Sequence, residues 1–140
     1  MKIFISSDHA GFFLKNQIFE NLKKKKFKIT NLGPFSDKSI DYPIFAKKLA
    51  NKVARNKSSF GILICGSGTG MAMAANKVKN IRAAVCYNVK NTKLSRLHNN
   101  ANIITVGSRL TRKNLAFKLV NIFLKTKFEG GRHLRRIKKI

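Results

Sequence analysis

Short apolar segments alternate with longer amphipathic segments along the whole chain. Five apolar segments have the length and composition of buried strands: residues 2–6, 27–31, 60–65, 81–86 and 102–106. The segments between and after them place apolar residues at helical spacing: residues 11–26, 42–53, 71–78, 92–98, 115–124 and, as a basic helix or tail, 132–139. Pro43 supports the start of the second helix, because proline suits the first helical positions.

This alternation favours a parallel sheet that is covered by helices on both faces. The sequence therefore predicts an α/β fold: a three-layer α/β/α, Rossmann-like single domain over residues 1–140 with a five-stranded parallel sheet. Ligands of such sheets bind beyond the carboxyl ends of the strands. Unusual polar residues follow strands at Asp8-His9, at 65–70 and at Ser108-Arg109, and His98-Asn99 stands just before the last strand.

The net charge of +25 is of the kind found in nucleic-acid-binding proteins. The lysines are nevertheless spread along the sequence, and no nucleic-acid-binding motif is found, so we expect a solvated basic surface and no specific nucleic-acid partner. The apolar stretches are far shorter than the roughly 20 residues that span a bilayer. The apolar run at residues 1–5 is also too short for a signal peptide. We expect no membrane partner and a cytoplasmic location.

A glycine-rich turn, Cys65-Gly66-Ser67-Gly68-Thr69-Gly70, joins a buried strand to a helix. Glycines let main-chain N–H groups approach a ligand closely, and the following helix start presents further unpaired N–H groups. This pattern predicts a cradle for an anion. Two anions fit: a phosphate group, or the enediolate that forms when a proton leaves the carbon beside a carbonyl.

The two cysteines are predicted to be free thiols, because disulfide frameworks usually need more cysteines and an oxidising compartment. Cys65 directly precedes the glycine turn, where helix-start amides would favour a thiolate that can act as a general base. Cys86 also ends a strand, but no glycine cradle follows it, so we assign it to packing.

The three histidines, His9, His98 and His133, lack the paired spacing of a metal site, so we expect no metal and no cofactor. A histidine at a strand-end crevice is suited to donate a proton to a sugar ring oxygen. Arginine matches phosphate geometry better than lysine does. Arg109, and Arg132 with Arg136 one helical turn apart, are therefore candidates for a phosphate clamp.

Several segments together resemble the type B ribose-5-phosphate isomerase family, which includes allose- and galactose-6-phosphate isomerases. The resembling segments are Ser7-Asp8-His9-Ala10-Gly11, Asp41-Tyr42-Pro43, residues 61–70, Ala74-Ala75-Asn76-Lys77, residues 98–102, Gly107-Ser108-Arg109 and residues 128–133. They occur in the family's order and span nearly the whole chain.

The resemblance implies that Cys65 moves the proton between C1 and C2, with Ser67 assisting, and that His98 assists ring opening as a proton donor. The substrate contacts that it implies are Asp8, His9, Tyr42, Gly66, Ser67, Gly68, Thr69, Gly70, Asn99, Arg109, Arg132 and Arg136. Some members of the family use a glutamate base in the helix after the glycine turn. This chain has no acidic residue between Asp41 and Glu129, so only the thiol version is available.

The expected function is the interconversion of D-ribose 5-phosphate and D-ribulose 5-phosphate through a cis-enediol(ate), within the pentose phosphate pathway. The resemblance also implies a homodimer or homotetramer with shared sites, in which His98, Asn99 and Arg109 would reach Cys65 of a second copy. Three alternatives remain open: the same chemistry on allose 6-phosphate or galactose 6-phosphate, a basic nucleic-acid-binding protein on the same fold, and a nucleotide-binding module that uses the glycine turn.

Overall fold

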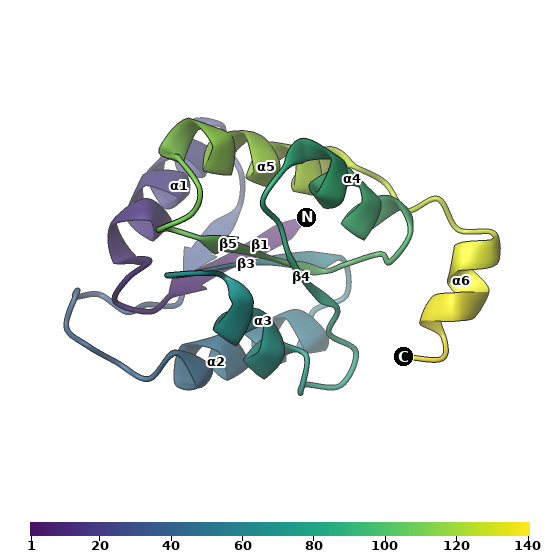
Figure 1. The fold of residues 1–140 in the computed structure, drawn as a ribbon, viewed down its shortest axis with the longest axis horizontal. Helices are drawn as coiled ribbons and strands as arrows, with labels where there is room; N and C mark the ends of the chain where they lie inside the picture. The colour runs from purple at the N-terminus through teal and green to yellow at the C-terminus, as the bar shows by residue number, and fades with distance from the viewer.

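Five strands with apolar side chains on both faces form the centre of the molecule, which the computed structural model describes over residues 1–140 (Figure 1). The strands are β1 (Lys2–Ser7), β2 (Ile29–Asn31), β3 (Ser59–Cys65), β4 (Ala83–Val85) and β5 (Ile103–Gly107). The helices are α1 (Phe12–Lys24), α2 (Tyr42–Arg55), α3 (Thr69–Ala75), α4 (Val89–Leu97), α5 (Lys113–Lys125) and α6 (Arg132–Ile137).

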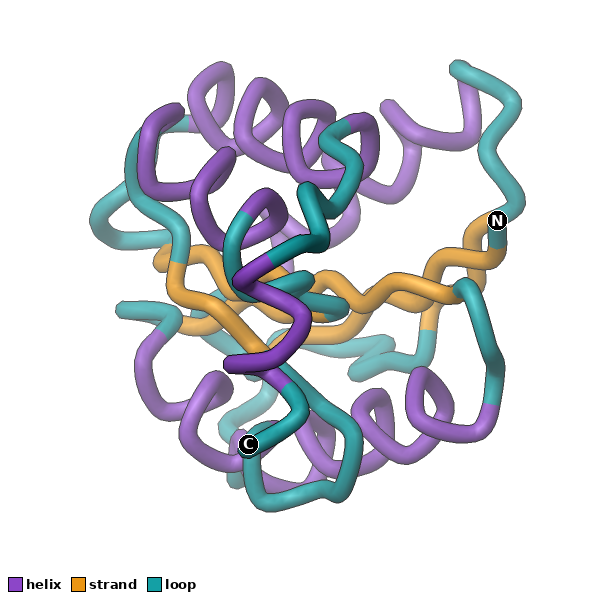
Figure 2. The backbone as a smooth tube through the Cα atoms, turned by 90° about the vertical axis from the view of Figure 1, so that its right-hand side faces the viewer, coloured by secondary structure: helices purple, strands orange, loops and turns teal.

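The strands form one sheet in the order β2-β1-β3-β5-β4, and every pair is parallel. Helices α1, α4 and α5 cover one face, while α2 and α3 cover the other, so that three layers are visible edge-on (Figure 2). A separate apolar core fills each interface between sheet and helices, with Ile62 and Phe123 in one core and Leu49 and Leu63 in the other. The predicted α/β fold with a five-stranded parallel sheet is confirmed.

Several predicted boundaries shift by one to three residues, and for two elements, α3 and β4, the structure shows the reason. The helix expected over residues 71–78 starts earlier, at Thr69, and ends earlier, at Ala75. The next residue, Asn76, exchanges two hydrogen bonds with the main chain of Ala83, at 2.7 and 2.9 Å, which ties it to β4 instead of to another helical turn. The strand expected over 81–86 shortens to Ala83–Val85, although Cys86 still donates its N–H to Thr105 on β5.

The parallel topology separates the two ends of the strands. Cys65 and Gly107 are paired at the carboxyl edge of the sheet. Each crossover helix returns the chain to the amino edge, so the residues after α4 and α5, including His98 and Glu129, lie at the opposite edge. A strand of seven residues such as β3 separates the two edges by about 20 Å.

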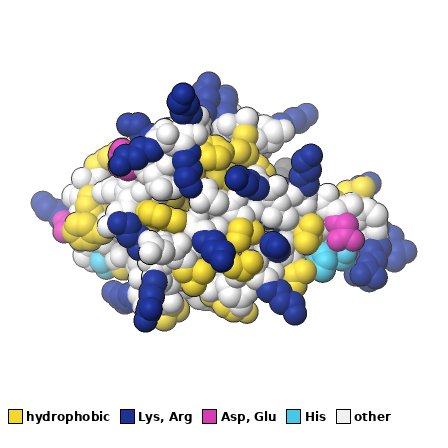
Figure 3. Space-filling model, turned by 90° about the horizontal axis from the view of Figure 1, so that it is seen from above, with side chains coloured by type: hydrophobic (Ala, Val, Ile, Leu, Met, Phe, Trp, Pro, Cys, Tyr) yellow, Lys and Arg dark blue, Asp and Glu magenta, His cyan; other side chains and the backbone are white.

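Basic side chains are distributed over the surface, as the sequence predicted. Figure 3 shows lysines and arginines over the whole face that it displays, most of them apart from one another, with few acidic side chains among them. The side chains of Lys23 to Lys26, at the end of α1, are all exposed. None of the helices has the length and apolar character needed to cross a membrane.

Candidate active site

The sulfur of Cys65 lies against the main chain of the glycine turn at the carboxyl edge of the sheet. The side chain is 5% exposed, and the N–H of Gly68 donates to its Sγ at 3.1 Å. An amide that donates to sulfur stabilises the negative charge of a thiolate. The turn therefore holds a potential base and an amide donor side by side.

Glycine is required at two positions that give the turn its shape. Gly68 has a φ of 81°, which side-chain-bearing residues rarely adopt, and it directly precedes α3. Gly107, at the end of the neighbouring strand β5, approaches so closely that an added Cβ would lie 2.7 Å from the main chain of Ser67. The hydroxyl of Ser67 accepts the N–H of Thr69 at 3.2 Å. The only group that donates to the sulfur of Cys65 is the Gly68 amide.

Asp8 and His9 come directly after β1, the strand that lies beside β3. Asp8 is 7% exposed; its N–H donates to Ile64 at 3.1 Å, and its Oδ1 accepts the N–H of Gly11 at 2.9 Å. These bonds hold the carboxylate next to the end of β3. The Nδ1 of His9 accepts the N–H of Ile40 at 3.4 Å, which leaves Nε2 for another partner.

Tyr42 and Arg109 border the glycine turn within the same chain. The ring of Tyr42, the first residue of α2, lies over Gly70, where an added Cβ would be 2.8 Å from the ring. Arg109 is exposed; its N–H donates to Gly66 at 3.0 Å, and its side chain packs along Gly66. We expected Arg109 to act on Cys65 of a second copy. In the structure Arg109 lies beside the glycine turn of its own chain, because β5 is the parallel neighbour of β3.

A second group of predicted residues gathers at the amino edge. The rings of His98 and His133 are stacked with centroids 4.2 Å apart, and the Nε2 of His98 lies 3.8 Å from the Oε2 of Glu129. Glu129 is fixed by its N–H, which donates to Leu97 at 3.1 Å. Burial, and next the proximity of His98, lower the pKa of His133. No role could be assigned to Glu129 or His133 from the sequence, although both belong to the resembling segment 128–133.

These three side chains are the one cluster in the chain with the composition of a metal site. Their ligand atoms lie within 4.8 Å of one another. The planes of the two imidazoles are, however, only 9° from parallel, so their nitrogen lone pairs run side by side. A metal ion needs lone pairs that converge on one point. The arrangement therefore suits a stacked histidine pair better than a preformed metal centre.

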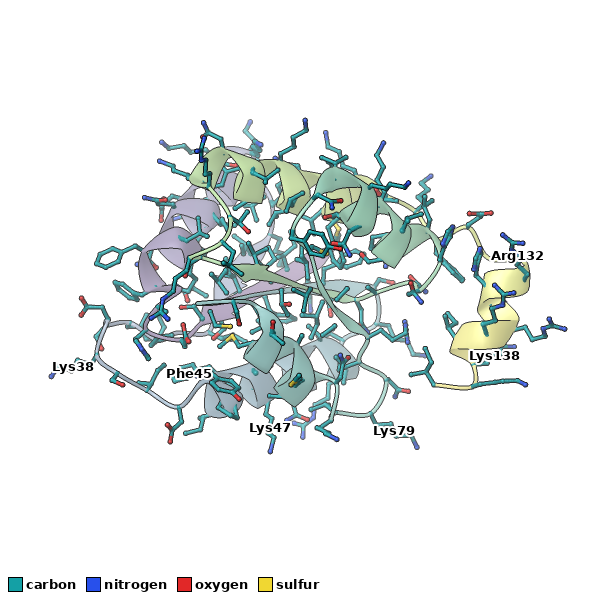
Figure 4. The ribbon with its side chains drawn as sticks, in the orientation of Figure 1. Lys38, Phe45, Lys47, Lys79, Arg132 and Lys138 are labelled. Atoms are coloured by element: carbon teal, nitrogen blue, oxygen red, sulfur yellow. The ribbon has the colours of Figure 1, made fainter.

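The remaining predicted residues also lie at this amino-edge end. Asn99 is exposed and follows His98, while Arg132 and Arg136 are exposed on α6. Figure 4 shows Arg132 on α6, which projects from the sheet on the side away from α3 and the glycine turn. Within one chain the structure thus brings together Asp8, His9, Tyr42, residues 65–70 and Arg109, and it keeps His98, Asn99, Arg132 and Arg136 apart from them.

Comparisons with known proteins agree with this arrangement of segments. A family model described as "Ribose/Galactose Isomerase" matches residues 3–140. The chain is 50% identical over 140 residues to the "Probable ribose-5-phosphate isomerase B" of Mycoplasma genitalium, covering 99% of this chain and 92% of that protein.

Solved structures of similar proteins superpose on nearly the whole chain. Ribose-5-phosphate isomerase B of Clostridium thermocellum gives a TM-score of 0.97 at 45% identity, covering 99% of this chain and 94% of that one. The Mycoplasma genitalium ribose-5-phosphate isomerase B, crystallised with bound ribulose-5-phosphate, gives a TM-score of 0.95 at 49% identity, covering 99% and 92%.

Proposed function

The chain belongs to the ribose/galactose isomerase family, and we propose that it interconverts D-ribose 5-phosphate and D-ribulose 5-phosphate through a cis-enediolate. The observation that carries this proposal is the contact of the Cys65 sulfur with the Gly68 amide at the carboxyl edge of the sheet. It is supported by the similar structure that holds ribulose-5-phosphate. The reaction needs one base that can reach two adjacent carbons and donors for the oxygen that becomes negative.

In this mechanism the thiolate of Cys65 removes the proton from C2 of the open-chain aldose. The electron pair forms the C1–C2 double bond, and the carbonyl oxygen on C1 becomes the enediolate oxygen. Main-chain N–H groups in the turn from Gly66 to Gly70 donate to that oxygen, with Ser67 assisting from the same turn. The hydroxyl on C2 passes its proton to the oxygen on C1 and becomes the ketone, while Cys65 returns its proton to C1.

Substrate contacts follow from the residues around the turn. We assign the sugar hydroxyls to Asp8, the wall of the pocket to Tyr42 and Thr69, and the phosphate to Arg109 together with the free Nε2 of His9. A charge-assisted hydrogen bond of this type contributes about 1.5–3 kcal/mol.

Ring opening requires a further proton donor, because His9 at the carboxyl edge is assigned to the phosphate. We propose that His98 of a second copy donates the proton to the ring oxygen, with Asn99 holding the sugar and Arg132 and Arg136 holding the phosphate. The protein would then be a homodimer or homotetramer with shared sites. The projecting helix α6 supports this, because its apolar Leu134 is 43% exposed in the single chain and both arginines stand on the same helix.

A six-carbon substrate such as allose 6-phosphate or galactose 6-phosphate is the second candidate, since the matching family model is described by both ribose and galactose. Both thiols are free, as in proteins of reducing compartments. We therefore propose that the reaction takes place in the cytoplasm, as a step of the pentose phosphate pathway.

The deciding experiment is an assay of ketose formation from ribose 5-phosphate in the presence of a metal chelator. We expect turnover that survives chelation, and a higher kcat/KM for ribose 5-phosphate than for the two six-carbon sugar phosphates. A folded protein with no turnover of any of the three would refute the proposal. If kcat/KM were higher for a six-carbon sugar phosphate, that compound would be the proposed substrate in place of ribose 5-phosphate.

A further inference from the structure

Two arginines at the amino edge, Arg82 and Arg96, are partly or fully buried without a carboxylate partner. Arg96 is 6% exposed, and Arg82 is half-buried. The chain has only five acidic residues, and its single ion pair joins His98 to Glu129. Buried charges in proteins are usually paired. This pair of guanidinium groups therefore lacks the counter-charge that burial normally requires.

The contacts of Arg96 hold it firmly in place. Its guanidinium packs against the rings of Phe60 and Phe123, with its central carbon 4.7 and 5.5 Å from their centroids. Its Nε donates to the carbonyl of Thr126 at 3.2 Å, and its Nη1 donates to the Oδ1 of Asn100 at 2.9 Å and to Ala101. No contact occupies Nη2, so two donors of a fixed guanidinium remain free.

Arg82, the residue before β4, contacts the turn that follows α4. Its Nε donates to the carbonyls of Asn99 and Asn100 at 3.0 and 3.1 Å, and its Nη2 donates to Asn100 at 3.0 Å. Its Nη1 has no partner. The neighbouring charge of Arg82 adds to burial in lowering the pKa of Arg96, as expected for two like charges that face each other without an acid.

Both arginines line a cavity of about 540 Å³ at the amino edge of the sheet. Its other polar lining residues are Asn56, Lys57, Ser58, Ser59, Asn80, Asn100 and Asn102, and Met1 at the N-terminus also borders it. No aspartate or glutamate is among them. The cavity thus collects three side-chain cations, several amide and hydroxyl groups, and no negative charge.

We propose that this cavity binds a small anion of the phosphate class that carries at least two negative charges. Three observations support this class of ligand: unpaired guanidinium donors in fixed positions, a third cation at Lys57, and a volume larger than a single phosphate needs. The guanidinium group of an arginine can donate two parallel hydrogen bonds to two oxygens of a phosphate, and asparagine and serine side chains can bind the remaining oxygens. The site lies behind the turn that carries His98 and Asn99, and it shares no residue with the glycine turn.

Pyrophosphate is a suitable probe, measured by isothermal titration calorimetry on the full chain. The titrations use an Arg109→Ala background, which weakens anion binding at the proposed sugar-phosphate site. The informative variant is Asn100→Asp, because it places a carboxylate 2.9 Å from the Nη1 of Arg96 without changing the size of the side chain. We expect it to neutralise the arginine pair and to weaken pyrophosphate binding at least tenfold.

Two lysines provide a matched comparison. Lys57 lines the cavity just after α2, and Lys24 is an exposed lysine at the end of α1 outside it. We expect Lys57→Gln to weaken binding several-fold and Lys24→Gln to leave it unchanged. Equal affinity of Asn100→Asp and its parent would overturn the proposal, as would equal losses in the two lysine variants. Binding of duplex DNA by a chain that gives no heat with pyrophosphate would also overturn it.

Discussion

The main-chain N–H of Gly68 donates to the sulfur of Cys65 at 3.1 Å, so the residue that bends the turn also contacts the proposed base. If Cys65 carries the proton, Cys65→Ala should lower kcat by about 10²- to 10⁴-fold. The control is Cys86→Ala: Cys86 is equally buried, and burial raises the pKa of its thiol, but it faces Ser95 and no glycine turn. Near-normal turnover by a folded Cys65→Ala protein would contradict the mechanism.

The close approach of Gly107 to Ser67 makes a second prediction about the turn. In Gly107→Ala the new Cβ would lie 2.7 Å from main-chain atoms of Ser67, so the turn must shift. We expect a stability loss of about 1–3 kcal/mol, as for other overpacked sites. The fall in kcat should exceed the change in KM, because the amides move relative to the reacting oxygen. Denaturant unfolding and steady-state kinetics measure the two effects, and an unchanged kcat would argue against the amide cradle.

Sharing of the site between two copies predicts complementation. Cys65→Ala and His98→Ala homomers should each be nearly inactive. In a dimer that contains one chain of each kind, one of the two sites combines an intact Cys65 with an intact His98. Random pairing of equal amounts should therefore restore about a quarter of the wild-type activity.

The complementation is measured after co-expression, or after unfolding and refolding of the mixture. Each variant refolded alone serves as the control. If a mixture of well-folded variants remains as inactive as its components, both residues act within one chain and the shared-site proposal is wrong.

A buried lysine makes stability depend on pH. Lys15 is fully buried, donates to the carbonyl of Pro34 and lies 4.9 Å from the ring of Phe12; burial lowers its pKa from 10.5 to about 8. Between these values the unfolded chain binds the proton and the folded chain does not, so unfolding takes up a proton. This group therefore makes the folded state more stable as pH rises from about 8 to 10.5.

Comparison of two variants isolates this contribution. Lys15→Met should lose the rise in unfolding free energy over that pH window, relative to the wild-type chain. Lys23→Met, at an exposed position of the same helix, should keep it. Urea unfolding at a series of pH values is the measurement, and parallel curves for Lys15→Met and the wild type would show that Lys15 titrates normally.

The features that could be predicted from the sequence are those encoded locally. Apolar runs marked the strands, and the glycine turn after Cys65 marked the carboxyl edge, because each depends on neighbouring residues. The position of Arg109 could not be predicted, since it depends on β5 lying next to β3, and strand order is not visible in a hydrophobic pattern.

Long-range contacts also explain why some burial differs from what the helical pattern favours. On the helix expected over residues 11–26, the apolar Phe12 and Phe19 are only partly buried, while the charged Lys15 is fully buried beside Pro34. The ring of Phe35 and the carbonyl of Pro34 come from another part of the chain, and they make the burial of Lys15 possible. The Arg82 and Arg96 pair was missed for the same reason.

The placement of Cys65 and His98 at opposite edges of one sheet bears on how activity depends on protein amount. If His98 of a second copy opens the sugar ring, as proposed, a single chain holds Cys65 without that histidine beside it. Below the dissociation constant of the assembly, the total rate would grow with the square of the chain concentration rather than in proportion to it. Serial dilution would then abolish the activity while every chain stays folded. A newly synthesised chain would be inactive until it associated with a second chain.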